Sequence, residues 1–123
     1  MSSRSAPWGT NESVHFSERA HLKLLHVEPG QRLSLQKHQH RAEHWVCLEG
    51  EVDALVDDTL RRLMRGDHVR VPMGSWHRLS NPTADVAVVA EVQVGRYSDL
   101  GAAERDVERA LDDYGRAPER LSA

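Results

Sequence analysis

Short apolar segments, several with the two-residue alternation of β-strands, recur along most of this chain. They cover residues 22–27, 33–40, 45–48, 52–56, 60–64, 68–71 and 86–94. Turns rich in glycine, proline and aspartate separate them, among them Glu28-Pro29-Gly30 and Asp57-Asp58. Short strands at such close spacing predict an all-β sandwich or barrel.

Two of these segments place polar side chains together on one face, because side chains alternate across a strand. In residues 33–40, the polar face consists of Ser34, Gln36, His38 and His40. In residues 86–94, valines occupy one face, whereas Glu91 and Gln93 lie on the other. We therefore expect polar chemistry on at least two strands of the sheet.

Only the C-terminal part of the chain changes to a helical period. The apolar residues that recur there are Val107, Ala110, Leu111 and Tyr114. This spacing predicts a short helix over 102–114, which Gly115 ends. Residues 1–6 and 117–123 are predicted to be tails, and 7–116 to form a single domain.

The composition is ordinary for a globular protein of 123 residues, with 39% hydrophobic and 28% charged residues. The net charge of -3 and the lack of a basic run argue against nucleic-acid binding. No segment approaches the roughly 20 apolar residues of a membrane span, so no membrane association is expected. The single cysteine, Cys47, lies in an apolar run and indicates a buried thiol in a reducing compartment. We therefore expect a cytoplasmic protein.

Two glycine-containing motifs carry the candidate chemistry. The residues of the first are Gly30, Gln36, His38, Glu43 and Gly50. The residues of the second are Gly66, Pro72, Gly74, His77 and Asn81. Their spacings resemble the two motifs of the cupin family, with Gln36 where most cupins have histidine. The resemblance implies a cupin double-stranded β-helix, which is a jelly-roll barrel, followed here by the predicted helix.

Further segments resemble one branch of that family, the cupin domain of type II phosphomannose isomerase, which is usually fused to mannose-1-phosphate guanylyltransferase. They include Pro7-Trp8-Gly9, His40-Arg41-Ala42-Glu43-His44-Trp45, Glu91-Val92-Gln93 and Asp113-Tyr114-Gly115-Arg116. The likeness runs from about residue 7 to 116, which leaves no room for a nucleotide-binding fold. Three places depart from the family: Ala6 stands where it usually has arginine, the aromatic residue expected soon after Gly9 is missing, and residues 104–109 match its arginine segment only loosely.

The resemblance implies a metal-dependent aldose–ketose isomerase that interconverts mannose 6-phosphate and fructose 6-phosphate through an enediol. The implied metal ligands are Gln36, His38, Glu43 and His77. This mixed set suits Zn²⁺, the metal of phosphomannose isomerases, and also Mn²⁺, Fe²⁺, Co²⁺ or Ni²⁺. A metal near O1 and O2 of the sugar would polarise its carbonyl group.

Two further residues are candidates for catalysis. Glu91 is a lone carboxylate in an apolar strand and a candidate base, although a buried structural carboxylate would look the same. Arg109 could assist proton transfer or hold the substrate, but a helical ion pair with Asp113 would also explain it. The candidates for binding the phosphate are Lys23, Arg41 and Arg78. His40 and His44 are predicted to lie next to the ligands or to pack, and His21 is interpreted as incidental.

An alternative function is a non-catalytic metal-cupin that binds a sugar or nucleotide sugar, or regulates a partner enzyme. A metal-dependent dioxygenase is disfavoured, because Gln36 replaces a histidine ligand. The expected partners are a sugar phosphate substrate and a second copy of the chain, since cupin barrels commonly dimerise through edge strands.

Overall fold

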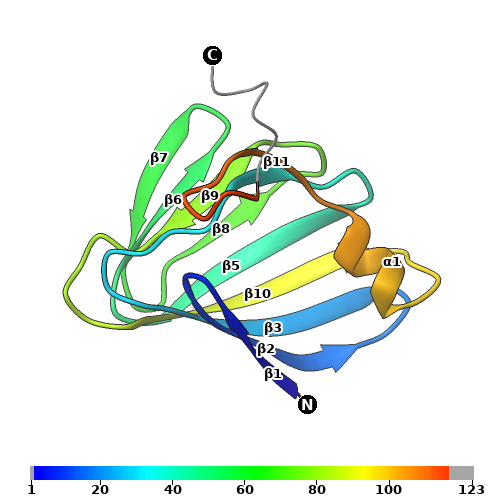
Figure 1. The fold of residues 1–123 in the computed structure, drawn as a ribbon, viewed down its shortest axis with the longest axis horizontal. Helices are drawn as coiled ribbons and strands as arrows, with labels where there is room; N and C mark the ends of the chain where they lie inside the picture. The colour runs from blue at the N-terminus through cyan, green and yellow to red at the C-terminus, as the bar shows by residue number, and fades with distance from the viewer. Residues whose placement is uncertain (1, 117–123) are drawn as a thin grey trace.

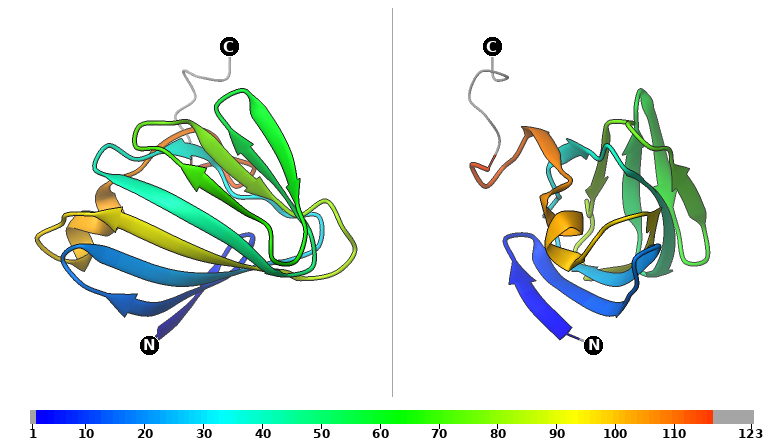
Figure 2. Two further views of the ribbon diagram at one scale, coloured as in Figure 1. Left: turned by 180° about the vertical axis from the view of Figure 1, so that it is seen from behind. Right: turned by 90° about the vertical axis from the view of Figure 1, so that its right-hand side faces the viewer.

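The computed structural model describes residues 2–116, and its two antiparallel sheets confirm the all-β prediction (Figures 1 and 2). The six-stranded sheet has the order β1 (Ser2–Ala6), β2 (Gly9–Phe16), β3 (Ala20–Val27), β10 (Ala87–Gly95), β5 (Arg41–Glu49) and β8 (His68–Val71). The five-stranded sheet has the order β11 (Glu108–Leu111), β4 (Leu35–Lys37), β9 (His77–Ser80), β6 (Val52–Val56) and β7 (Thr59–Leu63). The two sheets curve toward each other and enclose an interior.

The interior changes from apolar to polar along the three central strands β3, β10 and β5. Their register aligns the inward-facing side chains in cross-strand rows, which are Leu25–Val89–Cys47, Lys23–Glu91–Trp45 and His21–Gln93–Glu43. The first row is apolar and the last is polar. A hydrophobic core therefore fills one end of the barrel, and polar side chains line the other.

The hydrophobic core lies at the apolar end and closes it. Besides the residues of the apolar row, it contains the buried side chains of Trp8, Val27, Leu33, Trp45, Val52, Ala54, Leu63, Val69, Val71, Leu79 and Ala87. Cys47 is fully buried with a free thiol, as predicted. Among residues 2–116 there is no helix with the length and apolarity needed to cross a membrane.

The two ends of the chain differ from the sequence prediction. Residues 2–6, predicted to be a loose tail, form β1, which pairs with β2 at the edge of the six-stranded sheet. The predicted tail 117–123 lies outside the described residues. Backbone hydrogen bonds to a neighbouring strand give the small, polar N-terminal residues an extended conformation that their composition alone does not indicate.

The helix predicted over 102–114 is wrong in its position and extent. The helix of the described chain is α1 (Leu100–Arg105), which begins at Asp99, whose carboxylate accepts a hydrogen bond from the Ala102 N–H. The chain then continues as β11 and pairs with β4. The apolar spacing fits a helical period, but the open edge of β4 supplies hydrogen bonds that favour a strand.

Candidate metal centre and its cavity

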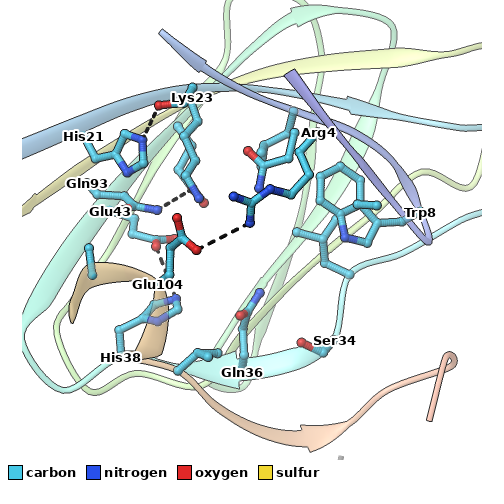
Figure 3. A pocket seen from close by; sticks show the side chains of 18 of the residues that line it. Arg4, Trp8, His21, Lys23, Ser34, Gln36, His38, Glu43, Gln93 and Glu104 are labelled. Atoms are coloured by element: carbon cyan, nitrogen blue, oxygen red, sulfur yellow. Dashed lines mark hydrogen bonds and ion pairs between the residues drawn. The ribbon is translucent and has the colours of Figure 1, made fainter. Parts of the chain in front are cut away.

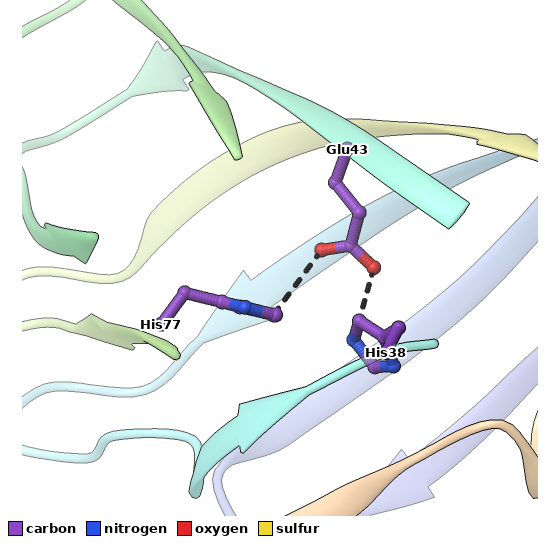
Figure 4. A group of neighbouring side chains, drawn as sticks. All are labelled: His38, Glu43 and His77. Carbon is purple, nitrogen blue, oxygen red and sulfur yellow. Dashed lines mark ion pairs between the residues drawn. The ribbon is translucent and has the colours of Figure 1, made fainter. Parts of the chain in front are cut away.

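Three buried side chains from separate elements converge inside the polar end of the barrel. His38 follows β4, Glu43 lies on β5 and His77 begins β9, and their donor atoms all lie within 4.8 Å of one another. His38 Nε2 is 3.2 Å from Glu43 Oε2, and His77 Nε2 is 3.6 Å from Glu43 Oε1. Figure 4 shows the Glu43 carboxylate between the two imidazole rings.

A turn in the second motif connects the two histidines. The Gly74 N–H donates a hydrogen bond of 3.0 Å to the backbone carbonyl of His38. Gly74 has a φ of 80°, in the left-handed region that glycine adopts without strain. The glycine of the motif therefore allows the turn before β9 to bond to the backbone just after β4, where His38 lies.

Hydrogen bonds fix both imidazole rings with their Nε2 atoms toward Glu43. His38 Nδ1 lies 2.6 Å from the Asp106 carbonyl, and His77 Nδ1 lies 2.9 Å from the Ser75 carbonyl. A carbonyl only accepts, so each Nδ1 carries the proton and each Nε2 a lone pair. Burial lowers the pKa of His38 to about 3 and also lowers that of His77, which keeps both rings neutral.

Without a cation, this arrangement brings acceptors together. Glu43 Oε1 and His77 Nε2 are buried and have no hydrogen-bond partner among residues 2–116. Burial raises the pKa of Glu43, and the nearby carboxylate of Glu91 raises it further, although Arg41 opposes both effects. A divalent cation would accept electron density from both lone pairs and stabilise the carboxylate. The buried His–Glu–His group is therefore compatible with a metal site.

Gln36 is the fourth predicted ligand. It lies opposite His77 in the pairing of β4 with β9, and its side chain lines the same cavity as His38 and Glu43. The Gln36 amide makes no hydrogen bond within residues 2–116. Its carbonyl oxygen is thus available to a metal ion or to a ligand in the cavity.

A cavity of about 320 Å³ opens from the candidate metal centre (Figure 3). Its positively charged lining residues are Arg4, Lys23, Arg41, Arg109 and Arg116. Its negatively charged lining residues are Glu43, Glu91 and Glu104. Five cationic groups against three carboxylates, in a chain of net charge -3, make the cavity suited to an anionic ligand.

Comparison with known proteins decides the family. The family described as Mannose-6-phosphate isomerase C-terminal matches residues 2–113. The chain belongs to this family. The alginate biosynthesis protein AlgA of Pseudomonas aeruginosa is 43% identical over 113 residues, which are 92% of this chain and 23% of AlgA. Mannose-1-phosphate guanylyltransferase of Escherichia coli is 37% identical over 110 residues, 89% of this chain and 22% of that protein. The chain thus spans less than a quarter of these relatives.

Solved structures confirm the cupin fold. An RmlC-like cupin from Shewanella frigidimarina has a TM-score of 0.70 at 17% identity, over 80% of this chain and 86% of that chain. A protein of Thermus thermophilus has a TM-score of 0.68 at 29% identity, over 71% of this chain and 83% of that chain. The expected double-stranded β-helix is therefore the fold of this mannose-6-phosphate isomerase C-terminal domain.

Glu91 lies beside the candidate metal centre of this cupin domain. It is 6% exposed and lines the cavity. Its carboxylate accepts hydrogen bonds from Trp45 Nε1 at 3.0 Å and from Gln93 Nε2 at 2.8 Å. Burial acts to raise the pKa of Glu91, but Lys23, a hydrogen bond with Glu43, the charge of Arg41 and the bond from Trp45 outweigh it and lower the pKa to about 2. Glu91 is therefore held as an ionised carboxylate.

The three phosphate candidates from the sequence fall into different environments. Lys23 and Arg41 line the cavity, whereas Arg78 does not. Arg41 donates to Glu43 at 3.0 Å and to the Ala103 carbonyl at 3.0 Å, and its Nη2 lies 3.2 Å from His38 Nε2. The guanidinium of Arg78 donates to the Leu33 carbonyl at 2.9 Å. Arg41 thus contacts two of the candidate metal ligands, and Arg78 joins strands.

Arg109, the second catalytic candidate, lies in a strand and lines the cavity. The helical ion pair with Asp113 does not form, because Asp113 lies instead 2.7 Å from Nε of Arg32. His40 and His44, predicted next to the ligands, are exposed. The strand conformation of residues 108–111 therefore directs Arg109 into the interior, and the two histidines lie away from the centre.

Other residues of the cavity were not singled out from the sequence. His21 is 4% exposed, and its Nε2 lies 2.6 Å from the Ser13 hydroxyl. Burial and the neighbouring charge of Lys23 together lower its pKa to about 4. Arg4 on β1 reaches Glu104 on α1 at 3.4 Å across the cavity. The alternation of His21 and Lys23 with leucines could have indicated a polar strand face here. No sequence pattern indicated that Arg4 lines the cavity.

Proposed function

We propose that this chain is a metal-dependent aldose–ketose isomerase that interconverts mannose 6-phosphate and fructose 6-phosphate. The buried His38–Glu43–His77 group carries the proposal, because it opens into a positively charged cavity beside the ionised carboxylate Glu91. Membership of the mannose-6-phosphate isomerase C-terminal family supports the substrate class. The proposal includes a cytoplasmic location, where sugar phosphates are made and consumed.

The four candidate ligands would hold Zn²⁺, with two imidazole nitrogens, one carboxylate and the amide oxygen of Gln36. When bound, such an ion acts as a Lewis acid toward the oxygens at C1 and C2 of the open-chain sugar. Asp106 and Ser75 hold the imidazole rings by their Nδ1 atoms. These contacts keep both ligand nitrogens aimed at one point.

Glu91 is the proposed proton-transfer group. In its ionised form it removes the proton from C2 of mannose 6-phosphate, and it returns a proton to C1, while the hydroxyl proton on O2 moves to O1. Trp45 and Gln93 fix the carboxylate in place through their hydrogen bonds. Lys23 and Arg41 raise the positive charge around the developing enediol.

The first test is conversion of mannose 6-phosphate by the zinc-loaded chain. We expect fructose 6-phosphate to form, and deuterium from the solvent to enter at C1 of this product and at C2 of recovered mannose 6-phosphate. Removing the metal with a chelator should abolish both, and Zn²⁺ should restore them. His77→Ala should bind less than one tenth of the wild-type zinc by elemental analysis. His68→Ala, which changes an exposed histidine, is the matched control.

Other outcomes of this test would contradict the proposal. Conversion that persists in the fully metal-free chain would exclude a metal-dependent reaction. Saturable binding of mannose 6-phosphate with neither conversion nor exchange at C2 would instead support the non-catalytic sugar-binding module.

A further inference from the structure

The cavity extends along β4, from the candidate metal centre toward Trp8. Figure 3 shows His38, Gln36 and Ser34 in this order, with Ser34 on the side of Trp8. Ser34 is 1% exposed, and its hydroxyl has no hydrogen-bond partner among residues 2–116. Buried hydroxyl groups are nearly always hydrogen-bonded, so this unpartnered one on the cavity wall is free to bond to a ligand in the cavity.

A guanidinium with an unused donor lies on the strand next to Ser34. Arg109 on β11 is opposite Gln36 in the pairing with β4, and it also lines the cavity. Its buried Nε has no hydrogen-bond partner among residues 2–116. Burial lowers the pKa of Arg109, and the nearby charge of Arg116 lowers it further. The negative charge of an anionic ligand would oppose both effects.

The other three arginines of the cavity have partners already. Arg41 contacts Glu43, His38 and the Ala103 carbonyl. Arg4 pairs with Glu104, and Arg116 pairs with Asp112. The side chain of Lys23 has no hydrogen bond or ion pair within residues 2–116, but it is only partly buried. Arg109 is therefore the cation of this set whose buried donor is still unused.

We propose that Ser34 and Arg109 form the subsite that binds the phosphate group of the substrate. The identity of the sugar in this inference rests on the proposed function. That the ligand carries an anionic group is inferred separately, from the unused hydrogen-bond donors of Ser34 and Arg109. Arginine and hydroxyl donors together suit the oxygens of a phosphate monoester.

The length of the substrate fits this placement. Ser34 and Gln36 are two residues apart on a strand, which separates them by roughly 7 Å. In an open-chain hexose 6-phosphate, six single bonds of about 1.5 Å join C2 to phosphorus, and an extended chain of them spans about 7–8 Å. Phosphate at Ser34 and Arg109 therefore leaves C1 and C2 beside Gln36 and the candidate metal centre.

The test measures binding of inorganic phosphate, mannose 6-phosphate and mannose by calorimetry, with and without zinc. Arg109→Gln should weaken binding of both phosphate ligands about 10- to 100-fold, and Ser34→Ala about threefold to tenfold. Arg109→Lys keeps the charge and should recover part of the affinity. Arg61→Gln, which changes an exposed arginine on β7, is the control. Binding of mannose should be the same in all variants.

Thermal unfolding shows whether each variant is folded. Ser34→Ala removes a hydroxyl without a partner, so it should be at least as stable as the wild type, and it keeps the test valid if Arg109→Gln does not fold. In turnover, both variants should raise KM more than they lower kcat, as expected for a binding group. A loss confined to kcat would overturn the subsite.

The subsite and the proposed function can fail separately. If the chain binds phosphate through Ser34 and Arg109 but does not isomerise the sugar, the function is wrong and the subsite stands. If the chain isomerises mannose 6-phosphate, and both variants keep the wild-type affinity and KM, the subsite is wrong and the function stands.

Discussion

Two carboxylates, Glu43 and Glu91, lie close together in the polar end of the barrel but have different surroundings. Glu43 faces two neutral imidazoles and is the group whose pKa is raised. Glu91 receives hydrogen bonds from Trp45 and Gln93 and has a lowered pKa. Carboxylates that the environment separates in this way can take separate roles, which agrees with the proposed roles of Glu43 as a metal ligand and Glu91 as a base.

Glu91→Gln tests the role of the base. The amide keeps an acceptor for Trp45 Nε1, and its new donor can bond to the unpartnered Oε1 of Gln93 once the Gln93 amide turns over. We expect the free energy of unfolding to change by less than about 1 kcal/mol, and zinc content to remain at the wild-type value. Deuterium exchange at C2 and kcat should fall at least about 100-fold.

Glu49→Gln, which changes an exposed carboxylate on the same strand as Glu43, is the control for that variant and should retain full activity. An unchanged rate of exchange in Glu91→Gln would remove Glu91 from the proton transfer. A loss of zinc together with activity would instead show that Glu91 acts through the metal site.

Among single residues, the sequence predicted the candidate ligands that lie in short motifs. It did not predict the cavity residues that only the pairing of distant strands brings into place. His38, Glu43 and His77 follow glycine turns at fixed spacing, so their meeting could be expected from the motifs. Arg4 and Ser13 reach the cavity only because β1 and β2 pair beside β3. That pairing is a long-range contact, which local patterns do not contain.

Among the elements, the segment after α1 shows how a tertiary contact overrides a local period. Asp106 ends the helix, and its carboxylate accepts hydrogen bonds from the backbone N–H groups of Gln39 at 2.8 Å and His40 at 3.0 Å. Its backbone carbonyl meets His38 Nδ1. The helical spacing of residues 107–114 therefore matters less than the attachment of this segment to β4.

In strand β10, by contrast, the local pattern of the sequence agrees with the structure. Its alternation was predicted correctly, with Glu91 and Gln93 on the face away from the valines. The structure adds that this polar face points inward, because Glu91 is 6% and Gln93 2% exposed, whereas Val94 is 50% exposed. Periodicity determines which residues share a face, but only the packed sheet determines which face is inside.

Asp106→Ala tests the attachment of the helix end. The variant loses both backbone hydrogen bonds and the one from Tyr97, so we expect it to be destabilised by about 1–3 kcal/mol in denaturant unfolding. The backbone carbonyl of residue 106, which orients His38, should be held less firmly. Zinc affinity should therefore fall about 10- to 100-fold. Asp85→Ala is the control, because its carboxylate is exposed and has no hydrogen bond within residues 2–116. Wild-type zinc affinity in Asp106→Ala would contradict the link between the end of α1 and the candidate metal centre.

For the whole molecule, the polar interior of the six-stranded sheet has an apolar exterior. The side chains that alternate with the inward rows form the outer rows Leu24–Ala90–Val46 and Leu22–Val92–His44. Leu48 and Val94 add to this surface, with 39% and 50% exposure. An apolar face at the centre of a sheet is a common feature of surfaces that associate.

We propose that this face, rather than the sheet edges, joins two copies of the chain. At one side of the sheet Glu12 lies next to Leu24, and at the other side His68 and Arg70 lie next to Val46 and His44. A two-fold axis along β10 places the β2 side of one copy over the β8 side of the other. Acidic Glu12 then meets basic His68 and Arg70 at both ends of the same apolar surface.

Light scattering of the wild-type chain should therefore give twice the monomer mass. Val92→Asp puts two like charges close to the axis and should yield monomers, while Leu60→Asp changes an equally apolar but 65% exposed residue on β7 and should leave the dimer intact. Glu12→Arg should weaken the dimer, and adding His68→Glu with Arg70→Glu should restore it, because the exchange reverses every charge pair across the axis. A monomeric wild type, or a dimer that Val92→Asp leaves unchanged, would contradict this surface, since an interface elsewhere on the barrel has no reason to respond to a charge at its centre.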